Sequence, residues 1–450
     1  MAQASHEKTD QGQQSNKVRL AASSEDITRR QEPAKDRIPG FFETAHWTAD
    51  GTTILTSASS NQISGYVVPR DLLEHHDEPL TLSPQSTINL GETSNVLASA
   101  PYFNLADPYT KQLLVSSRDH PIQLYYLFPP SSDGTDIPSH TPASSYPLIK
   151  ARSETFLSAT SLLWPSPGSH FIAGCRNFIA KFDASRTGEE PILRIKTIPS
   201  ERHLLKGGGV GMRGTVSTLA AQPPDQNHTS VVAAGTWTRW VGLYDFSQAG
   251  ECISTWSIAD AVKETARGSR DGIGGDGITE TKWSPCGRYL LLSERKSRGI
   301  LVYDVRVMGQ LLGWLEDRDA LSNQRVHCDV FPSQDEFGGF EVWSGTTSGA
   351  VKVWEGVGHH AGAQPPAWDW QAHDSTVGST CLHPTGTVIA TCSGAWEFPA
   401  DESQPTDQQH ENERDGGDPQ DKDKSETWMH RRSKESTLKI WDLNVSNGMS

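Results

Sequence analysis

Basic side chains recur in the short turns that separate pairs of apolar runs along this chain. The turns carry Arg118, Arg176, Arg239, Arg295, Lys296 and Arg298, and the loops that precede such pairs add Arg213 and Arg325. Cations gathered in this way can bind the phosphates of a nucleic acid or the carboxylates of an acidic peptide. They can also form ion pairs with the chain's own acids, for which Asp119, Asp245, Asp276 and Glu294 are available.

Two tryptophans flank Arg239 in the sequence. Trp237 falls in the turn and Trp240 begins the following apolar run, so Trp237 is the candidate contact and Trp240 is the candidate packed strand residue. An aromatic ring beside a guanidinium can stack on an unpaired base. If the basic set neutralises about six phosphates of a single strand, its affinity should fall with salt at a log–log slope of about −4.

The chain lacks the patterns that would indicate catalysis. No Gly-x-Ser-x-Gly elbow occurs, and the glycine cluster at 207–211 is not followed by Gly-Lys-Ser/Thr. None of the six cysteines forms a CxxC pair, and the two His-His pairs lack a third ligand at metal spacing. We therefore expect no enzyme, cofactor, metal or small-molecule substrate. We also expect no membrane partner, because no apolar run approaches a membrane span.

A repeated hairpin pattern indicates the elements that must position these residues. The clearest copy is EVWSGTTSGAVKVWE (341–355), two apolar runs around a Gly/Ser turn. Further copies lie at 54–68, 113–127, 171–183, 231–245 and 290–304, and a split copy joins 388–394 to 437–443. About ten residues before each hairpin, an apolar strand runs into a Pro/Gly/Asp turn, as in WSPCG (283–287).

This self-similarity predicts an all-β, seven-bladed WD40 β-propeller. The turns recur at intervals wider than the roughly 40–45 residues of a lean WD repeat, which indicates long connecting loops. A large β-sandwich is the alternative, and the fixed period argues against it. In a propeller the basic turns and the loops before the first strands would share one face, so the cations would form a ring.

The sequence also suggests where the propeller begins and ends. We expect a mostly disordered tail at 1–40, the propeller at 41–443 and a C-terminal tail at 444–450. The chain stops too soon after residue 443 for an outer strand of the seventh blade. The strand-like run at 17–22 is therefore predicted to close the ring by pairing outside 437–443.

The charge of the chain is unevenly distributed. The formal net charge is −15, and residues 394–434 carry six basic against eleven acidic side chains. This composition predicts a disordered acidic insert within the seventh blade. Two interpretations remain open. The insert is a solvated spacer, or its residues 411–423 compete with a nucleic acid for binding to the cationic ring.

Several off-consensus stretches occur in the order typical of one WD40 family. They are SSRDHPIQ (116–123), AGCRN (173–177), VGLY (241–244), NQRV (323–326) leading to SGTTSGAV (344–351), and ATCSGAWEFP (390–399) followed by the acidic insert. Together they resemble the telomerase Cajal body protein family and its fungal, splicing-associated relatives, from about residue 41 to 443.

This resemblance implies a non-catalytic nuclear scaffold, with the cytoplasm as a second compartment. Its implied partners are a small non-coding RNA (a box H/ACA-type guide such as a scaRNA, telomerase RNA or a spliceosomal small nuclear RNA) and the ribonucleoprotein or spliceosomal proteins assembled on it. Its implied processes are ribonucleoprotein assembly in the Cajal body and mRNA splicing. A protein-only WD40 adaptor in a nuclear complex is the alternative.

Overall fold

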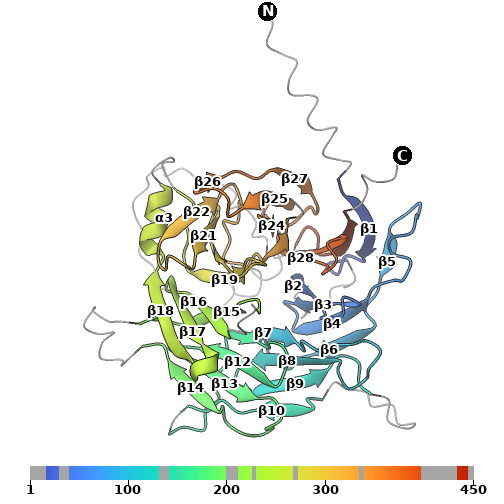
Figure 1. Cartoon of the computed structure of the whole chain (residues 1–450). Coiled ribbons are helices and arrows are strands. Elements are labelled where there is room, and N and C mark those ends of the chain that lie inside the picture. The colour runs from blue at the N-terminus through green and yellow to red at the C-terminus, as the bar shows by residue number, and fades with distance from the viewer. Residues whose placement is uncertain are drawn as a thin grey trace, which may run out of the picture.

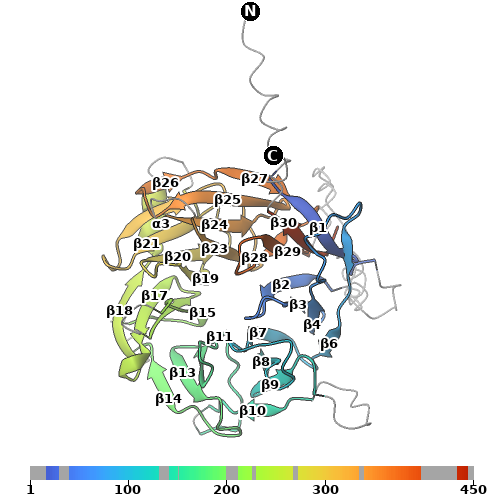
Figure 2. The same ribbon diagram turned by 45° about the vertical axis from the view of Figure 1, so that its right-hand side comes forward.

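Seven sheets form the structure, each with four antiparallel strands built on one of the predicted hairpins, and two of them carry a fifth, parallel strand at the edge. The computed structural model describes residues 17–29, 40–130, 141–150, 152–198, 211–224, 230–266, 272–333, 339–396 and 433–443. The sheets surround a central channel as the blades of a propeller (Figures 1 and 2). The predicted fold class is confirmed.

The strands take equivalent positions in every blade. The innermost are β2 (Phe42–Trp47), β7 (Ser94–Ser99), β11 (Ser161–Leu163), β15 (Val216–Ala221), β19 (Ile278–Trp283), β23 (Cys328–Pro332) and β28 (Val377–Leu382). The second are β3 (Thr53–Ala58), β8 (Gln112–Ser117), β12 (His170–Cys175), β16 (Val231–Thr236), β20 (Tyr289–Glu294), β24 (Phe340–Gly345) and β29 (Val388–Ser393). The third are β4 (Gln62–Val67), β9 (Ile122–Tyr126), β13 (Phe178–Asp183), β17 (Trp240–Asp245), β21 (Ile300–Asp304), β25 (Ala350–Val357) and β30 (Leu438–Asp442). The fourth are β6 (Ser86–Asn89), β10 (Ser144–Tyr146), β14 (Leu193–Lys196), β18 (Glu251–Ser257), β22 (Leu311–Leu315), β27 (Trp368–Gln371) and, in blade seven, β1 (Arg19–Ser24).

The hydrophobic core lies between the blades. Each cluster of buried apolar side chains joins two neighbouring sheets, as where Trp343 and Val353 of blade six pack with Ile389 and Trp441 of blade seven. The tryptophans that end the inner strands also hydrogen-bond across these interfaces. Trp283 Nε1 donates to Ala220 O of blade four at 3.1 Å, and Trp47 Nε1 donates to Cys381 O of blade seven at 2.9 Å. The recurring aromatic therefore both fills the wedge between blades and fixes their spacing.

An N-terminal strand completes the seventh blade. β1 runs antiparallel to β30, with Arg19 opposite Asp442 and Ser23 opposite Lys439 (Figure 2). Ala22 is fully buried between blades seven and one, and an ion pair of 3.1 Å joins Arg19 Nη2 to Asp442 Oδ2. β1 is not the outermost strand, because β5 (Leu80–Leu82) from the long loop of blade one pairs with it in parallel.

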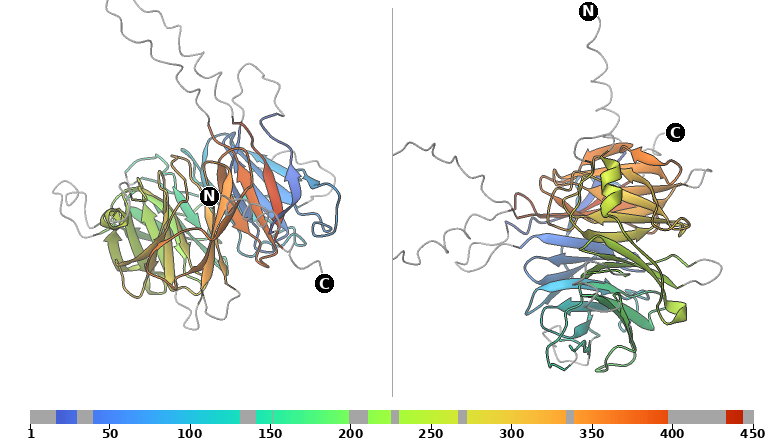
Figure 3. Two further views of the ribbon diagram at one scale, coloured as in Figure 1. Left: turned by 90° about the horizontal axis from the view of Figure 1, so that it is seen from above. Right: turned by 90° about the vertical axis from the view of Figure 1, so that its left-hand side faces the viewer.

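Blade five also gains a fifth strand. β26 (Gly362–Gln364), from a loop of blade six, pairs in parallel with β22. The 3₁₀-helix η1 (Phe246–Gln248) follows β17, and the short helix α3 (Ala259–Thr265) packs on the core between blades four and five, beside β21 and β22 (Figures 1 and 3). Within the described residues, no helix is long and apolar enough to cross a membrane. Most of the predicted tail and acidic insert, and residues 444–450, lie outside the described residues.

Candidate partner-binding face

The turns that carry the basic residues lie on one face of the disc, because successive antiparallel strands alternate direction. Backbone hydrogen bonds join these turns from blade to blade. Asn177 N of blade three donates to Gly214 O of blade four at 2.9 Å, and Lys296 N of blade five donates to Ser322 O of blade six at 2.9 Å. Within blade four, Trp237 N donates to Thr215 O at 3.2 Å. We call one set of residues on this face the rim: Arg118, Arg176, Arg213, Trp237, Arg239, Arg295, Lys296 and Arg298.

Arg176, Arg213 and Trp237 meet where blade three adjoins blade four. The backbone of Arg176 bridges Thr215, and the hydroxyl of Thr238 donates to Arg213 O at 2.6 Å. Arg176 is exposed and Arg213 is half-buried, and among the described residues neither has a carboxylate within ion-pair distance. The side chain of Trp237 is 40% exposed, whereas Trp240 packs against the core between blades three and four. This corner of the rim offers both guanidinium groups and a free indole surface.

Arg239 forms an ion pair across the contact between blades four and five. Its Nε lies 2.8 Å from Glu294 Oε1, and its Nη2 donates to Glu294 Oε2 at 3.0 Å. The Glu294 side chain is only 2% exposed, and burial raises its pKa against the opposing effect of Arg239. Arg239 holds φ at 65°, a left-handed conformation that costs a residue with a Cβ about 1–2 kcal/mol. This buried ion pair leaves Arg239 little freedom to bind a partner.

The remaining rim cations also have acids nearby. Arg295 and Lys296 share Asp276, whose Oδ2 lies 3.7 Å from Arg295 Nε and 3.3 Å from Lys296 Nζ. Arg118 Nε lies 3.8 Å from Asp119 Oδ2, with both side chains mostly exposed. Exposed ion pairs of this kind contribute about 0–1 kcal/mol to stability. Each of these cations can therefore leave its acidic neighbour to bind a phosphate. Arg298 is exposed in the same turn as Lys296, while Asp245 accepts hydrogen bonds from the backbone N and the hydroxyl of Ser247.

Arg325 departs from the predicted ring, because its side chain enters the central channel. Its Nη2 donates to Thr160 O at 3.4 Å, across the ring from blade six to blade three. The side chain lines a cavity of about 500 Å³ together with residues from the inner strands of blades one to five and from the loop before the inner strand of blade six. Arg325 therefore belongs to the channel and not to the rim.

A charged network in this channel was not anticipated from the sequence. Glu280 Oε1 lies 3.2 Å from His327 Nδ1, and its Oε2 accepts from Cys328 N at 2.8 Å. Burial alone would raise the pKa of Glu280, but His327 and Lys282 bring it down to about 2. Lys282 Nζ bonds Asp329 Oδ1 at 3.0 Å. The available signal was the run Thr279-Glu280-Thr281-Lys282, because four consecutive polar residues depart from the alternation of polar and apolar residues that is usual in a half-buried strand.

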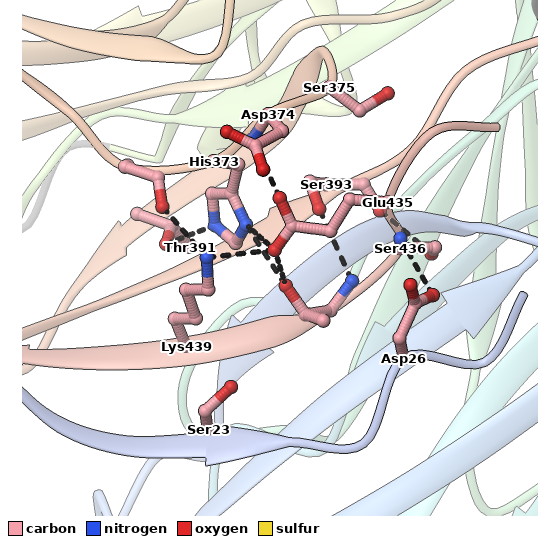
Figure 4. Close-up of polar contacts among 12 residues, drawn as sticks. Ser23, Asp26, His373, Asp374, Ser375, Thr391, Ser393, Glu435, Ser436 and Lys439 are labelled. Carbon is pink, nitrogen blue, oxygen red and sulfur yellow. Dashed lines mark hydrogen bonds and ion pairs between the residues drawn. The ribbon is translucent and has the colours of Figure 1, made fainter. Parts of the chain in front are cut away.

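A second network, also missed, anchors the acidic insert where it rejoins blade seven (Figure 4). His373 Nε2 and Thr391 Oγ1 lie 2.8 Å apart, and Trp441 Nε1 donates to the same hydroxyl at 2.9 Å. Glu435 Oε1 lies 3.4 Å from His373 Nδ1 and 2.7 Å from Lys439 Nζ. Burial alone would raise the pKa of Glu435, but hydrogen bonds from His373, Asp374 N, Lys439 and Thr437 hold it well below its usual range.

This network ties both ends of the insert to the ring closure. Asp374 N donates to Glu435 Oε2 at 2.6 Å, and Ser436 N donates to Asp26 Oδ1 at 3.1 Å beside β1 (Figure 4). Ala395 N, at the departing end, donates to Ser433 Oγ at 3.3 Å. The sequence signal was a histidine after the outer strand of blade six followed by a Trp-Asp pair at the end of β30.

Comparison with known proteins supports the fold and the resemblance. No family model matches the chain. It is 27% identical over 362 residues to telomerase Cajal body protein 1 of Bos taurus, a match that covers 80% of this chain and 58% of that protein. The human protein of the same name is 26% identical over 362 residues, with the same coverage. The chain thus spans less than two thirds of these mammalian relatives.

Fungal relatives match over a larger share of their own length. Guanine nucleotide-binding protein negative regulator 1 of Schizosaccharomyces pombe is 26% identical over 317 residues, which is 70% of each chain. Protein SWT21 of Kluyveromyces lactis is 28% identical over 311 residues, or 69% of this chain and 67% of that protein. The resemblance to the telomerase Cajal body proteins and to fungal relatives is confirmed.

Proposed function

We propose that this protein is a nuclear scaffold that binds a small non-coding RNA on the rim and helps to assemble its ribonucleoprotein. The names of the mammalian relatives point to telomerase and the Cajal body, which favours a box H/ACA-type guide RNA or telomerase RNA. A spliceosomal small nuclear RNA is the other candidate within this class.

The observation that carries the proposal is the corner formed by Arg176, Arg213 and Trp237. Two arginines without a carboxylate partner among the described residues have their backbones next to the turn of Trp237, whose side chain is 40% exposed. Phosphate neutralisation and base stacking are the two interactions that single-stranded RNA requires, and stacking contributes about 1–3 kcal/mol per base. Arg118, Lys296 and Arg298 extend the basic surface to either side.

The ion pairs reduce the number of phosphates that the rim can neutralise. Arg239 is committed to Glu294, and Arg325 lies in the channel. Six of the eight basic residues remain, and three of these six, Arg118, Arg295 and Lys296, have an acidic neighbour that a phosphate must displace. Neutralisation of about six phosphates corresponds to a log–log salt slope of about −4 for single-stranded RNA, and neutralisation of about three or four corresponds to a slope of about −2 to −3.

Fluorescence anisotropy with labelled single-stranded RNA tests the proposal. R176A/R213A should weaken binding at least tenfold and flatten the salt dependence, and W237A should weaken binding with the salt slope unchanged. The matched control is R186A/R288A. Both arginines are exposed, but they lie in turns at the opposite face of the disc, where Arg186 follows β13 and Arg288 precedes β20. Equal affinities for R176A/R213A and the wild type would refute the rim as the RNA site.

A protein-only adaptor is the second candidate. It is favoured by the fungal relative named as a negative regulator of a guanine nucleotide-binding protein, which this chain matches over 70% of both lengths. Crosslinking in cells followed by sequencing separates the two. Enriched small RNA supports the scaffold of a ribonucleoprotein, whereas a complex that survives high salt and yields no crosslinked RNA supports the adaptor.

A further inference from the structure

The central channel holds a polar cavity of about 500 Å³ at the face that carries the rim. Its walls come from the first residues of the inner strands, including Thr44 of β2, Ser94 of β7, Ser217 of β15 and Thr279 of β19. Inner strands begin at the face where the rim turns lie. Extended segments of a partner can therefore reach this cavity from the same side as the rim.

Arg325 is the cation that dominates the cavity. Its one hydrogen bond among the described residues is the long contact of Nη2 with Thr160 O, at 3.4 Å. No carboxylate of the described residues lies within ion-pair distance of it, although Glu280 and Glu43 act on it from farther away. Burial lowers the pKa of Arg325, and the more distant Glu280 and Glu43 oppose this shift only in part.

Two of the other charged groups in the cavity have close partners. Glu280 is held by His327 and by Cys328 N, and Lys282 is held by Asp329. Burial, with His327 and Lys282 nearby, lowers the pKa of His46 to about 3, so this imidazole is uncharged at neutral pH. Burial raises the pKa of Glu43, with Arg325 opposing. Lys282 and Arg325 are the lysine and arginine of the cavity wall, and among the described residues only Lys282 has a carboxylate at ion-pair distance.

A single carboxylate fits Arg325 better than a phosphate. A guanidinium binds a carboxylate through two parallel N–H···O bonds, and the neighbouring amides of Asn95 and Asn323 provide further donors on the cavity wall. A phosphate dianion would bring a second negative charge toward Glu280 and Glu43, which both act on Arg325. The chemistry therefore selects a singly charged anion.

We propose that the channel cavity is a second binding site, which takes the carboxylate of an acidic residue on an extended segment of a protein partner, with Arg325 as its anchor. The site is separate from the rim, and it does not depend on RNA binding. It would allow the propeller to hold a protein in the channel while the rim remains free.

Binding of two blocked tripeptides to the full chain tests this proposal. The probes are acetyl-Gly-Glu-Gly-amide and its twin acetyl-Gly-Gln-Gly-amide, measured by ligand-observed NMR at millimolar concentrations. The wild type should bind the glutamate peptide about tenfold more tightly than the glutamine peptide, since a charge-assisted pair replaces a neutral one. R325Q should remove this preference, and R176A/R213A should retain it while losing RNA.

Two further measurements keep the proposal refutable if R325Q folds poorly. A photoreactive version of the glutamate peptide should crosslink to the wild type at channel residues such as Asn95 or Asn323. Inorganic phosphate should compete more weakly than the glutamate peptide. Equal binding of the two peptides, crosslinks confined to the outer surface, or stronger competition by phosphate would each overturn the assignment.

Discussion

Replacing Arg239 by alanine separates a structural role from a binding role for this rim residue. The substitution leaves the Glu294 carboxylate buried with Gly277 N, 3.1 Å from Oε1, as its remaining hydrogen-bond donor. Removing one partner of a buried ion pair generally costs about 3–5 kcal/mol, because the other charge remains without compensation. R239A should therefore destabilise the propeller much more than a surface substitution would.

Protonation of Glu294 limits this loss. Protonating a carboxylate costs about 1.4 kcal/mol for each unit by which the pH exceeds its pKa. Burial raises the pKa of Glu294 above the ordinary value of 4.5, so protonating this carboxylate at pH 7 costs at most about 3.4 kcal/mol. The expected destabilisation is thus about 3 kcal/mol at pH 7. Because R239A raises the folded-state pKa of Glu294 further above its unfolded value, the deficit should shrink as the pH falls toward 5.

Thermal unfolding monitored by circular dichroism from pH 5 to pH 7 measures this effect. R176A is the matched control, since it removes an exposed arginine of the same face and should change stability by about 0.5 kcal/mol or less. R239A/E294Q should recover part of the loss, because no charge remains buried. The reasoning fails if R239A is as mild as R176A at pH 7, or if its deficit does not depend on pH.

Three further predictions concern the ring closure and the insert. Deleting residues 1–24 should lower the melting temperature by removing β1 from between β30 and β5, whereas deleting 1–16 should not; an unchanged melting temperature after the longer deletion would show that β1 does not close the ring in solution. E435Q should lower stability at neutral pH, and its difference from the wild type should begin to shrink as the pH falls below about 4.5 and keep shrinking toward the lowered folded-state pKa, because a lowered folded-state pKa gives stability that is lost on acidification; a difference that does not change between pH 7 and pH 3 contradicts this account. Excising 397–432 through a short glycine linker, which the 3.3 Å contact between Ala395 N and Ser433 Oγ permits, should raise RNA affinity if 411–423 competes for the rim, and unchanged affinity would identify the insert as a spacer.

The fold could be predicted because its signals are local. Apolar alternation around a short turn defines each hairpin, and all the predicted hairpins pair as antiparallel strands, including the split copy made by β29 and β30. The turn positions also place the rim on one face, since antiparallel strands alternate direction. The missing outer strand of blade seven pointed to the N-terminus, where β1 is found beside β30. The parallel strand β5 that covers β1 had no such signal, because it is three residues within a long loop.

What each basic side chain contacts was decided only by the closed ring. Arg239 and Glu294 are 55 residues apart, and Arg325 and Thr160 are 165 residues apart, yet each pair makes a hydrogen bond. Local pattern determines backbone direction, whereas an ion pair requires two side chains to approach within a few ångströms. That approach depends on the packing of one blade against the next. The sequence alone therefore located the basic turns, and the tertiary structure divided them into exposed arginines, an interblade ion pair and a guanidinium in the channel.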